Sequence, residues 1–368
     1  MALALALALS LCACGQKLVL PAPPAGTDDV TAMGATFSRA DELTERKMRE
    51  LLTPGATARL RAEQLDRADV ATWLDEGRLL FVTDTPWHGE RVEVRPLHGA
   101  TPSADSTRCV ACHFTGGLGG AGAFSERTFV GGDGDDATTA RVRAPRMLAG
   151  AALLELLAAE DPQRVPFGWE RGARTLREAV EHGARWHLGA EPTDAELDAL
   201  TLAVAAVPLP LEDTLEADSL RQRLANGRGF FVKWGCAACH VEALPLSHFT
   251  LRLSHGRTLD VEASTRAQLG IPTAAVRVPL FSDLKPHDVG TGTTADPGPF
   301  VTPPLWGVGT RLTFLHDGRV TTLDDAISAH AGEAAKAAAA WREAQLERRD
   351  LTLFLLTLTR PTRLEGSP

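Results

Sequence analysis

The sequence predicts a mainly α-helical protein in which two similar domains stand in tandem and are joined by long loops. Two observations lead to this prediction: helical patterns that begin at threonine caps, and three short landmarks that occur twice in the same order. No long stretch has the alternating pattern of a β-strand. A chain of 368 residues with 44% hydrophobic and 23% charged residues has the composition of an ordinary folded protein and is long enough for two domains.

The chain begins with a short run of alanine and leucine, residues 1–14, that ends in small residues and cysteine. This run is shorter than the roughly 20 apolar residues needed to span a bilayer and is typical of a signal peptide. Leu11-Cys12-Ala13-Cys14 resembles a bacterial lipoprotein cleavage box, which predicts lipid and membrane attachment at Cys14; an ordinary cleaved signal is the alternative. Either reading predicts export, to the periplasm or to the outer membrane facing the periplasm or the cell surface. A linker follows over residues 15–30.

Five further segments have the patterns of helices. They are Ala40–Leu52, Thr175–Trp186, Arg223–Trp234, Thr322–His330 and Glu343–Leu358. Thr175 and Thr322 each precede acidic residues in the first turn, which is the pattern of an N-cap. The last segment is rich in leucine but too short to cross a membrane, so we expect a buried terminal helix. Stretches rich in Gly, Pro and Thr predict the long loops: Gly116–Gly122, Gly131–Asp136 and Gly290–Pro299.

Three landmarks indicate an internal duplication. The first copy consists of Arg143-Ala-Pro-Arg-Met-Leu-Ala-Gly150, Phe167-Gly-Trp-Glu170 and Thr175-Leu-Arg-Glu-Ala-Val180. The second copy consists of Val301-Thr-Pro-Pro-Leu-Trp-Gly307, Phe314-Leu-His-Asp-Gly318 and Thr322-Leu-Asp-Asp-Ala-Ile327. We therefore predict an N-terminal domain over residues 31–207 and a C-terminal domain over residues 213–368, joined near Pro208–Glu212.

The cysteines indicate the chemistry of both domains. Of six cysteines, two lie in the signal segment and four form the motifs Cys109-Val-Ala-Cys112-His113 and Cys236-Ala-Ala-Cys239-His240. Covalent haem attachment needs two thiols about one turn apart and a histidine that ligates the iron, and CxxCH supplies all three. We therefore predict two covalently bound haem c groups in two cytochrome c-like domains. The alternatives are a zinc ion held by the four thiolates or a redox-active dithiol.

With these motifs in place, the chain resembles the bacterial di-haem oxidoreductase family and, more distantly, the di-haem cytochrome c peroxidases. The segments that carry the resemblance are Cys236–Val241, Phe281–Gly290, Thr302–Gly309, Phe314–Arg319, Ala326–Glu333 and, in the first half, Arg143–Gly189. The resemblance implies two cytochrome c-like domains with the haems near their interface. Two departures concern peroxide chemistry: Ala179 stands where the peroxidases have glutamine, and no histidine lies between His113 and His182.

The resemblance also implies a ligand set for the two irons. His113 and His240 are the ligands from the motifs, and His330 stands where the peroxidases carry an axial methionine. A second imidazole lowers the reduction potential relative to a thioether ligand. The sixth position of the first haem is either open or filled from three candidates: His182, His187 and Met147. Among these side chains His182 is preferred, because the repeat sets it one residue from the position equivalent to His330.

Further residues are candidates for catalysis. Beside an open iron, His182, His187 or Glu178 would shuttle protons; a surface position is the alternative for each. Trp169 matches the tryptophan that lies between the haems of the peroxidases, so the resemblance implies an electron relay, with plain packing as the alternative. Relatives hold calcium between their domains, and the acidic loop Gly131–Asp136 has suitable oxygen ligands, although a solvated loop is the simpler reading.

These features predict an exported oxidoreductase. The net charge of −9 argues against a nucleic-acid partner, which requires a concentrated positive surface. We expect one haem to receive electrons from a small donor protein or a quinone-linked donor, and the other to reduce a small molecule such as peroxide. The alternative is a bis-histidine electron-transfer protein without catalysis.

Overall fold

The computed structural model describes residues 16–20, 65, 67–85, 106–114, 120–122, 128–130, 141–170, 172–209, 218–294 and 296–358. Four sequence predictions therefore lie outside the described residues. They are the signal segment with Cys14, most of the linker over residues 15–30, the helix Ala40–Leu52 and the acidic loop Gly131–Asp136.

The described part of the chain is mainly helical, as predicted. Its α-helices are α3 (Val70–Val82), α4 (Ala151–Ala159), α5 (Leu176–His182), α6 (Asp194–Ala205), α7 (Asp218–Lys233), α8 (Glu262–Leu269), α9 (Leu323–Ser328), α10 (Ala335–Glu343) and α11 (Glu347–Thr357). None of the helices within these ranges is both long and apolar enough to cross a membrane. The four predicted helices that the structure describes correspond to α5, α7, α9 and α11.

The predicted N-caps of α5 and α9 are confirmed. The Thr175 side chain accepts a hydrogen bond from the backbone N–H of Glu178, and the Thr322 side chain accepts one from Asp325. Each cap satisfies one of the N–H groups that a helix start leaves without an internal partner. The first of these helices ends earlier than predicted, at His182, and the chain continues as a π-helical turn over Gly183–His187.

The strands are short and form small sheets. They are β1 (Lys17–Val19), β2 (Thr128–Val130), β3 (Arg141–Arg143), β4 (Leu244–Leu246), β5 (Thr250–Arg252), β6 (Thr258–Asp260), β7 (Val276–Val278), β8 (Pro286–His287) and β9 (Phe300–Val301). The largest described sheet has the order β1-β6-β5, with β1 parallel to β6 and β5 antiparallel to it. The others are antiparallel pairs: β2-β3, β4-β7 and β8-β9.

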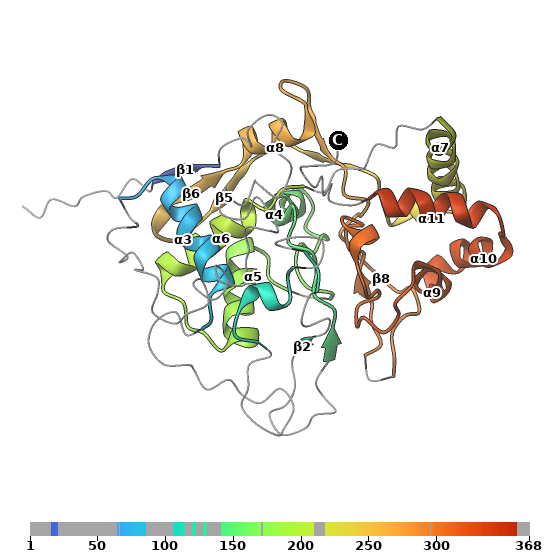
Figure 1. The fold of residues 1–368 in the computed structure, drawn as a ribbon, viewed down its shortest axis with the longest axis horizontal. Coiled ribbons are helices and arrows are strands. Elements are labelled where there is room, and N and C mark those ends of the chain that lie inside the picture. Colours follow the sequence, from blue (N-terminus) through green and yellow to red (C-terminus); the bar gives the residue numbers. More distant parts are fainter. Residues whose placement is uncertain are drawn as a thin grey trace, which may run out of the picture.

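The helices form two groups (Figure 1). The first group contains α3, α4, α5 and α6, with α3 packed against α6. The second contains α7, α9, α10 and α11, with α7 packed against α11. After α7 the chain returns to the first group, where β5, β6 and α8 lie. Apolar side chains between residues 244 and 280, and Leu284, accordingly belong to the core of the first group, whereas Phe281 belongs to the second core. The predicted domain bounds remain a prediction.

Each group has its own aromatic and aliphatic core. The first is centred on Trp73, Phe81 and the leucines of α4 and α6. The second contains Phe231, Trp341 and Phe354, which meet around the start of the second cysteine motif. Burying one such large side chain stabilises a fold by about 1.5–3 kcal/mol, so these clusters hold both groups of helices in place.

The first landmark of each copy, Arg143–Gly150 and Val301–Gly307, packs against its counterpart in the structure. Gly150 ends the first landmark and Gly307 ends the second, and both have a left-handed backbone, with φ of 68° and 67°. A Cβ atom on Gly150 would lie 2.5 Å from the Trp306 ring, and one on Gly307 would lie 2.0 Å from the Met147 side chain. Each copy therefore packs its large residue against the glycine of the other copy.

Candidate haem-binding sites

The first CxxCH motif forms a single tight turn. Cys109–Ala111 is a 3₁₀ helix, and the backbone N–H of Cys112 donates to the Cys109 carbonyl at 3.2 Å. This turn brings both thiols to one short stretch of backbone, as porphyrin attachment requires. Burial, together with the neighbouring Cys112, raises the pKa of the Cys109 thiol to about 12.

His113 is held as a neutral imidazole. Its Nδ1 lies 3.3 Å from the carbonyl oxygen of Gly120, in a loop that Gly122 pins to the motif by donating to the Cys112 carbonyl at 2.8 Å. Burial lowers the pKa of His113 to about 4, although hydrogen bonds with the backbone of Gly120 and Arg146 oppose this. An Nδ1–H that donates to a carbonyl leaves the Nε2 lone pair available for a metal.

The second motif repeats this design at the end of α7. Gly235 has a left-handed backbone (φ 93°) that ends the helix, and the 3₁₀ turn Cys236–Ala238 follows. The backbone N–H of His240 donates to the Cys236 carbonyl at 3.0 Å. Burial raises the pKa of the Cys236 thiol to about 11.

A backbone carbonyl also fixes His240. Its Nδ1 lies 3.0 Å from the carbonyl oxygen of Phe281, whose own backbone is left-handed (φ 53°). The loop is tied to the motif because Ser282 and Asp283 donate their N–H groups to the carbonyls of Val241 and Cys239. Burial lowers the pKa of His240 to about 4, so this imidazole is neutral too.

A cavity of about 400 Å³ lies beside the second motif. Cys236, Cys239 and His240 line it on one side, and His330 contributes to the same lining from the segment after α9. Apolar side chains make up most of the remaining wall, among them Phe231, Trp234, Phe300, Phe314, Ile327 and Leu355. Its size is within the range of ligand pockets.

His330 has the same arrangement as the two motif histidines. Its Nδ1 lies 2.7 Å from the carbonyl oxygen of Ala326, and burial lowers its pKa. A positive charge on the His330 imidazole would in turn lower the pKa of His240. Two neutral imidazoles with fixed tautomers therefore line one apolar cavity that also contains two thiols, a donor set that fits an iron porphyrin.

The zinc alternative does not fit this geometry. Within the described ranges, no three His, Cys, Asp or Glu side chains are placed to hold a metal ion together. The four motif cysteines all lie in these ranges, so they do not form one such group.

The remaining histidine candidates lie on or after α5. His182 stacks on Trp186 with ring centroids 4.2 Å apart, and its Nε2 lies 4.0 Å from the Glu178 carboxylate. That carboxylate also accepts from the backbone N–H of Arg174 at 2.8 Å, which engages it at the helix start. His187 lies at the end of the π-helical turn, and its charge would lower the pKa of His113. His187 therefore acts electrostatically on the histidine of the first motif.

Met147 is directed elsewhere. Its side chain packs against Gly307 and the first core. To ligate the iron of the first haem, the Met147 side chain would have to leave its contact with Gly307.

Comparison with protein families identifies the chain. The family model described as "Di-haem oxidoreductase, putative peroxidase" matches residues 174–358, which include the second CxxCH motif and His330. The chain belongs to the di-haem oxidoreductase family. No curated protein matches it.

Two solved structures are similar to this di-haem oxidoreductase. One is a hydrazine synthase of Kuenenia stuttgartiensis, with 18% identity, a TM-score of 0.46, and coverage of 83% of this chain and 97% of that chain. The other is a MauG-like protein associated with microbial copper homeostasis, with 16% identity, a TM-score of 0.40, and coverage of 78% and 89%.

Trp169 belongs to the wall of the second cavity of the oxidoreductase. Its Nε1 donates to the Ala144 carbonyl at 2.9 Å. The Arg146 guanidinium lies 5.7 Å from its ring centroid, and the Arg146 backbone is hydrogen-bonded to His113. A chain of contacts therefore joins the first motif histidine to the wall of the second cavity.

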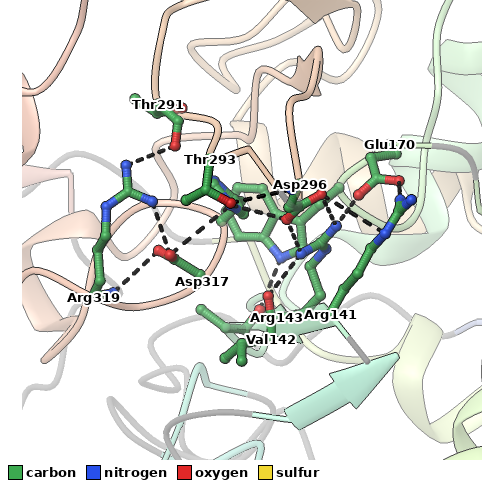
Figure 2. Close-up of polar contacts among 12 residues, drawn as sticks. Arg141, Val142, Arg143, Glu170, Thr291, Thr293, Asp296, Asp317 and Arg319 are labelled. Atoms are coloured by element: carbon green, nitrogen blue, oxygen red, sulfur yellow. Dashed lines mark hydrogen bonds and ion pairs between the residues drawn. The ribbon is translucent and has the colours of Figure 1, made fainter. Parts of the chain in front are cut away.

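A buried ionic cluster connects the two halves next to this wall (Figure 2). Arg143 on β3 pairs with Asp296 at 2.6 Å and with Glu170, and His316 Nε2 lies 3.3 Å from Asp296. Arg319 extends the cluster, because it pairs with Asp317 at 2.8 Å and donates to the Thr291 carbonyl at 2.6 Å. The sequence offered only the landmark Arg143–Gly150 as a signal for this cluster and none for Asp296.

Proposed function

We propose that this di-haem oxidoreductase is an exported c-type cytochrome with one haem attached by thioethers at each CxxCH motif. The observation that carries the proposal is the shared arrangement of His113 and His240. Each is half-buried, has a pKa lowered to about 4, follows a tight turn with two thiols, and has its Nδ1 within hydrogen-bond reach of a backbone carbonyl. Two independent copies of this arrangement support two haems.

Haem supplies one-electron chemistry at its iron; the chain determines what the iron encounters. The carbonyls of Gly120 and Phe281 orient the two proximal imidazoles. The apolar wall of the second cavity excludes water and lowers the local dielectric constant, which strengthens the influence of nearby charges. His330 presents a second Nε2 to that cavity, which favours a six-coordinate electron-transfer site there.

As an enzyme, the protein takes electrons from a small electron-donor protein or a quinone-linked donor and passes them to a small acceptor such as peroxide. The second haem is the electron-transfer site, and the first haem is the substrate-reducing site. Trp169 and Arg146 connect the two, which supports transfer between them within one chain. Proton delivery at the first haem falls to His187, His182 or Glu178.

A second function has one specific observation in its favour. The observation is that His330, whose Nδ1 lies within hydrogen-bond reach of a backbone carbonyl, lines the second cavity together with His240. At the first haem, His182 or His187 would be the corresponding second imidazole. With one of these histidines and His330 both bound, the protein would be a bis-histidine electron-transfer protein without catalysis.

Mass spectrometry and electron paramagnetic resonance of protein matured in a bacterial periplasm test these proposals. The covalent proposal expects the added mass of two haems, and bare polypeptide would overturn it. The enzyme proposal expects one high-spin iron in the oxidised or half-reduced state. Two low-spin irons in both states would favour the electron-transfer protein.

A further inference from the structure

A groove of about 680 Å³ lies among α7, α9, α10 and α11, next to the cavity of the second motif. Val308, Phe314 and Leu323 line the groove and also line that cavity. Single side chains therefore separate the two hollows. A molecule bound in the groove lies close to whatever occupies the cavity, which makes the groove a suitable place for electrons to enter.

Two tryptophans connect the groove with the cavity. Trp341 borders the groove and Trp234 borders the cavity, and their ring centroids are 6.2 Å apart in an edge-to-face arrangement. The Trp341 Nε1 donates to the Asp324 carboxylate at 3.1 Å, and the Arg348 guanidinium lies 5.3 Å from the centroid of its ring. These contacts fix the Trp341 ring, so the pair forms an aromatic path from the groove to the cavity.

The lining of the groove is rich in positive charge. Four arginines and one carboxylate contribute to it: Arg223, Arg311, Arg348, Arg349 and Asp324. Arg223 pairs with Asp350 at 2.6 Å and Arg348 with Asp324 at 3.3 Å, so two carboxylates offset part of this charge. Four guanidinium groups still outnumber them, and the Arg349 side chain is exposed.

This positive groove belongs to a chain with a net charge of −9. The whole molecule repels an acidic partner, whereas the groove attracts it, and this contrast directs the partner to the groove. Leu353 and Leu356 on α11 add apolar surface, with Leu356 44% exposed. An apolar centre with a charged rim is the composition of a protein interface, and weak electron-transfer interfaces are among the smallest.

We propose that this groove is an electron-entry site that docks a small acidic electron-transfer protein. One electron of the donor passes by tunnelling through Trp341 and Trp234 to the iron of the second haem. The donor is oxidised by one electron and the iron is reduced from ferric to ferrous, while neither tryptophan changes its oxidation state. The inference rests on the proposed electron-transfer role of the second haem, and it adds the surface and the charge of the donor.

Docking is tested on the haem-loaded protein with oxidised plant-type [2Fe–2S] ferredoxin, an acidic protein of low potential. Calorimetric titration measures its binding without electron transfer. R349E should weaken binding by about tenfold at low ionic strength, and added salt should remove the difference. R252E reverses the charge of an exposed arginine on β5 and is the matched control, which should bind as the wild type does.

The aromatic path is tested by stopped-flow mixing with reduced ferredoxin. W341L should lower the rate at saturating ferredoxin severalfold without changing the dissociation constant, whereas W341F keeps a ring and should retain most of the rate. W73F changes an equally buried tryptophan of the first core and should have no effect. Lumiflavin semiquinone, a small neutral reductant, needs no docking and should reduce the second haem of every variant at the wild-type rate.

Several outcomes would overturn the proposal. One is equal binding of ferredoxin by the wild type and R349E; another is weakened binding in K336E in place of R349E, because exposed Lys336 lines the cavity and not the groove. A saturating rate in W341L equal to that of W73F would exclude the path. A soluble quinol that reduces the wild type but not R349E, without ferredoxin binding, would assign the groove to a small molecule. Absence of haem mass would instead refute the proposed function.

Discussion

Three histidines show how much a single hydrogen bond determines at the residue scale. The Nδ1 atoms of His113, His240 and His330 lie 3.3, 3.0 and 2.7 Å from the carbonyl oxygens of Gly120, Phe281 and Ala326. A carbonyl oxygen only accepts, so each contact fixes the tautomer with Nδ1 protonated. Burial disfavours the imidazolium, and Nε2 remains free for iron.

Replacement of His330 by alanine should convert the second haem from low spin to high spin, because the imidazole on one side of the cavity is lost. Absorption and electron paramagnetic resonance spectra measure this change. His248 lies at the surface, 3.2 Å from Glu160, and H248A is the matched control. A low-spin signal that persists in H330A would refute His330 as a ligand.

Glu155 on α4 gives a prediction for pH. Burial raises the pKa of this carboxyl to about 7, against an ordinary value of 4.5, although the Leu176 N–H that donates to it at 2.5 Å opposes the shift. The folded state therefore binds the proton more tightly than the unfolded state. The contribution of Glu155 to the free energy of unfolding is fully present below pH 4.5. It is lost as the pH rises to 7, and the loss is at most about 3 kcal/mol.

E155Q should remove this dependence, because the amide stays neutral and its oxygen still accepts from Leu176. Denaturant unfolding of the haem-loaded protein at several pH values between 4.5 and 7 measures the slope. If the free energy of unfolding changed with pH in the same way in the wild type and in E155Q, the raised pKa would be contradicted.

At the scale of elements, a π-helical turn over Gly183–His187 follows α5 and carries the chain from His182 to His187. The predicted helix continued to Trp186, but its α-helical part ends at His182. Glycine weakens a helix, and such turns often occur at functional sites. His182 is the last residue of α5 and His187 the last residue of the π-helical turn, so a regular helical spacing does not relate the two side chains.

The contact between α7 and α11 depends on one glycine. A Cβ atom on Gly227 would lie 2.1 Å from the Asp350 carbonyl oxygen, whereas a Cβ on Gly229 would meet nothing within 4 Å. G227A should therefore destabilise the protein by about 1–3 kcal/mol through overpacking. G229A, the matched control on the same helix, should stabilise it by about 0.5–1 kcal/mol because alanine favours helix.

Thermal unfolding of both glycine variants, with haem attached, distinguishes the two effects. Equal melting temperatures in G227A and G229A would contradict the close approach of α11. Since α7 leads directly into the second motif, G227A should also broaden the spectrum of the second haem.

At the scale of the whole molecule, the ionic cluster holds the two halves together. Arg143 and Asp296 are 7% and 13% exposed, and breaking such a buried pair costs about 3–5 kcal/mol. D296A should destabilise the protein by about 3 kcal/mol. This is the lower end of that range, because Glu170 still pairs with Arg143 in the variant. The exposed pair Arg185–Glu191, 2.8 Å apart and 47% exposed on both sides, supplies the control E191A, with a loss below about 1 kcal/mol.

Denaturant unfolding with the haems attached measures both losses. A D296A variant as stable as E191A would show that the cluster does not hold the halves together. The rate of electron transfer between the haems should fall in D296A as well, because Ala144, which packs with Trp169 and donates to the His316 carbonyl, is anchored next to this cluster.

The sequence by itself determined the features whose partners are close along the chain. Two thiols and a histidine on one turn, the caps Thr175 and Thr322, and the helices α5, α7, α9 and α11 all depend on spacings of a few residues, so periodicity and cap chemistry predict them. The family resemblance added His330, which the structure places on the lining of the second cavity.

Only the tertiary structure decided which distant groups meet. Arg143 and Asp296 are 153 residues apart, and Phe281 supplies a carbonyl to a histidine 41 residues away. Apolar side chains between residues 244 and 280 pack on the first group of helices. No local spacing encodes such contacts, because they follow from how whole elements bury their apolar faces against each other.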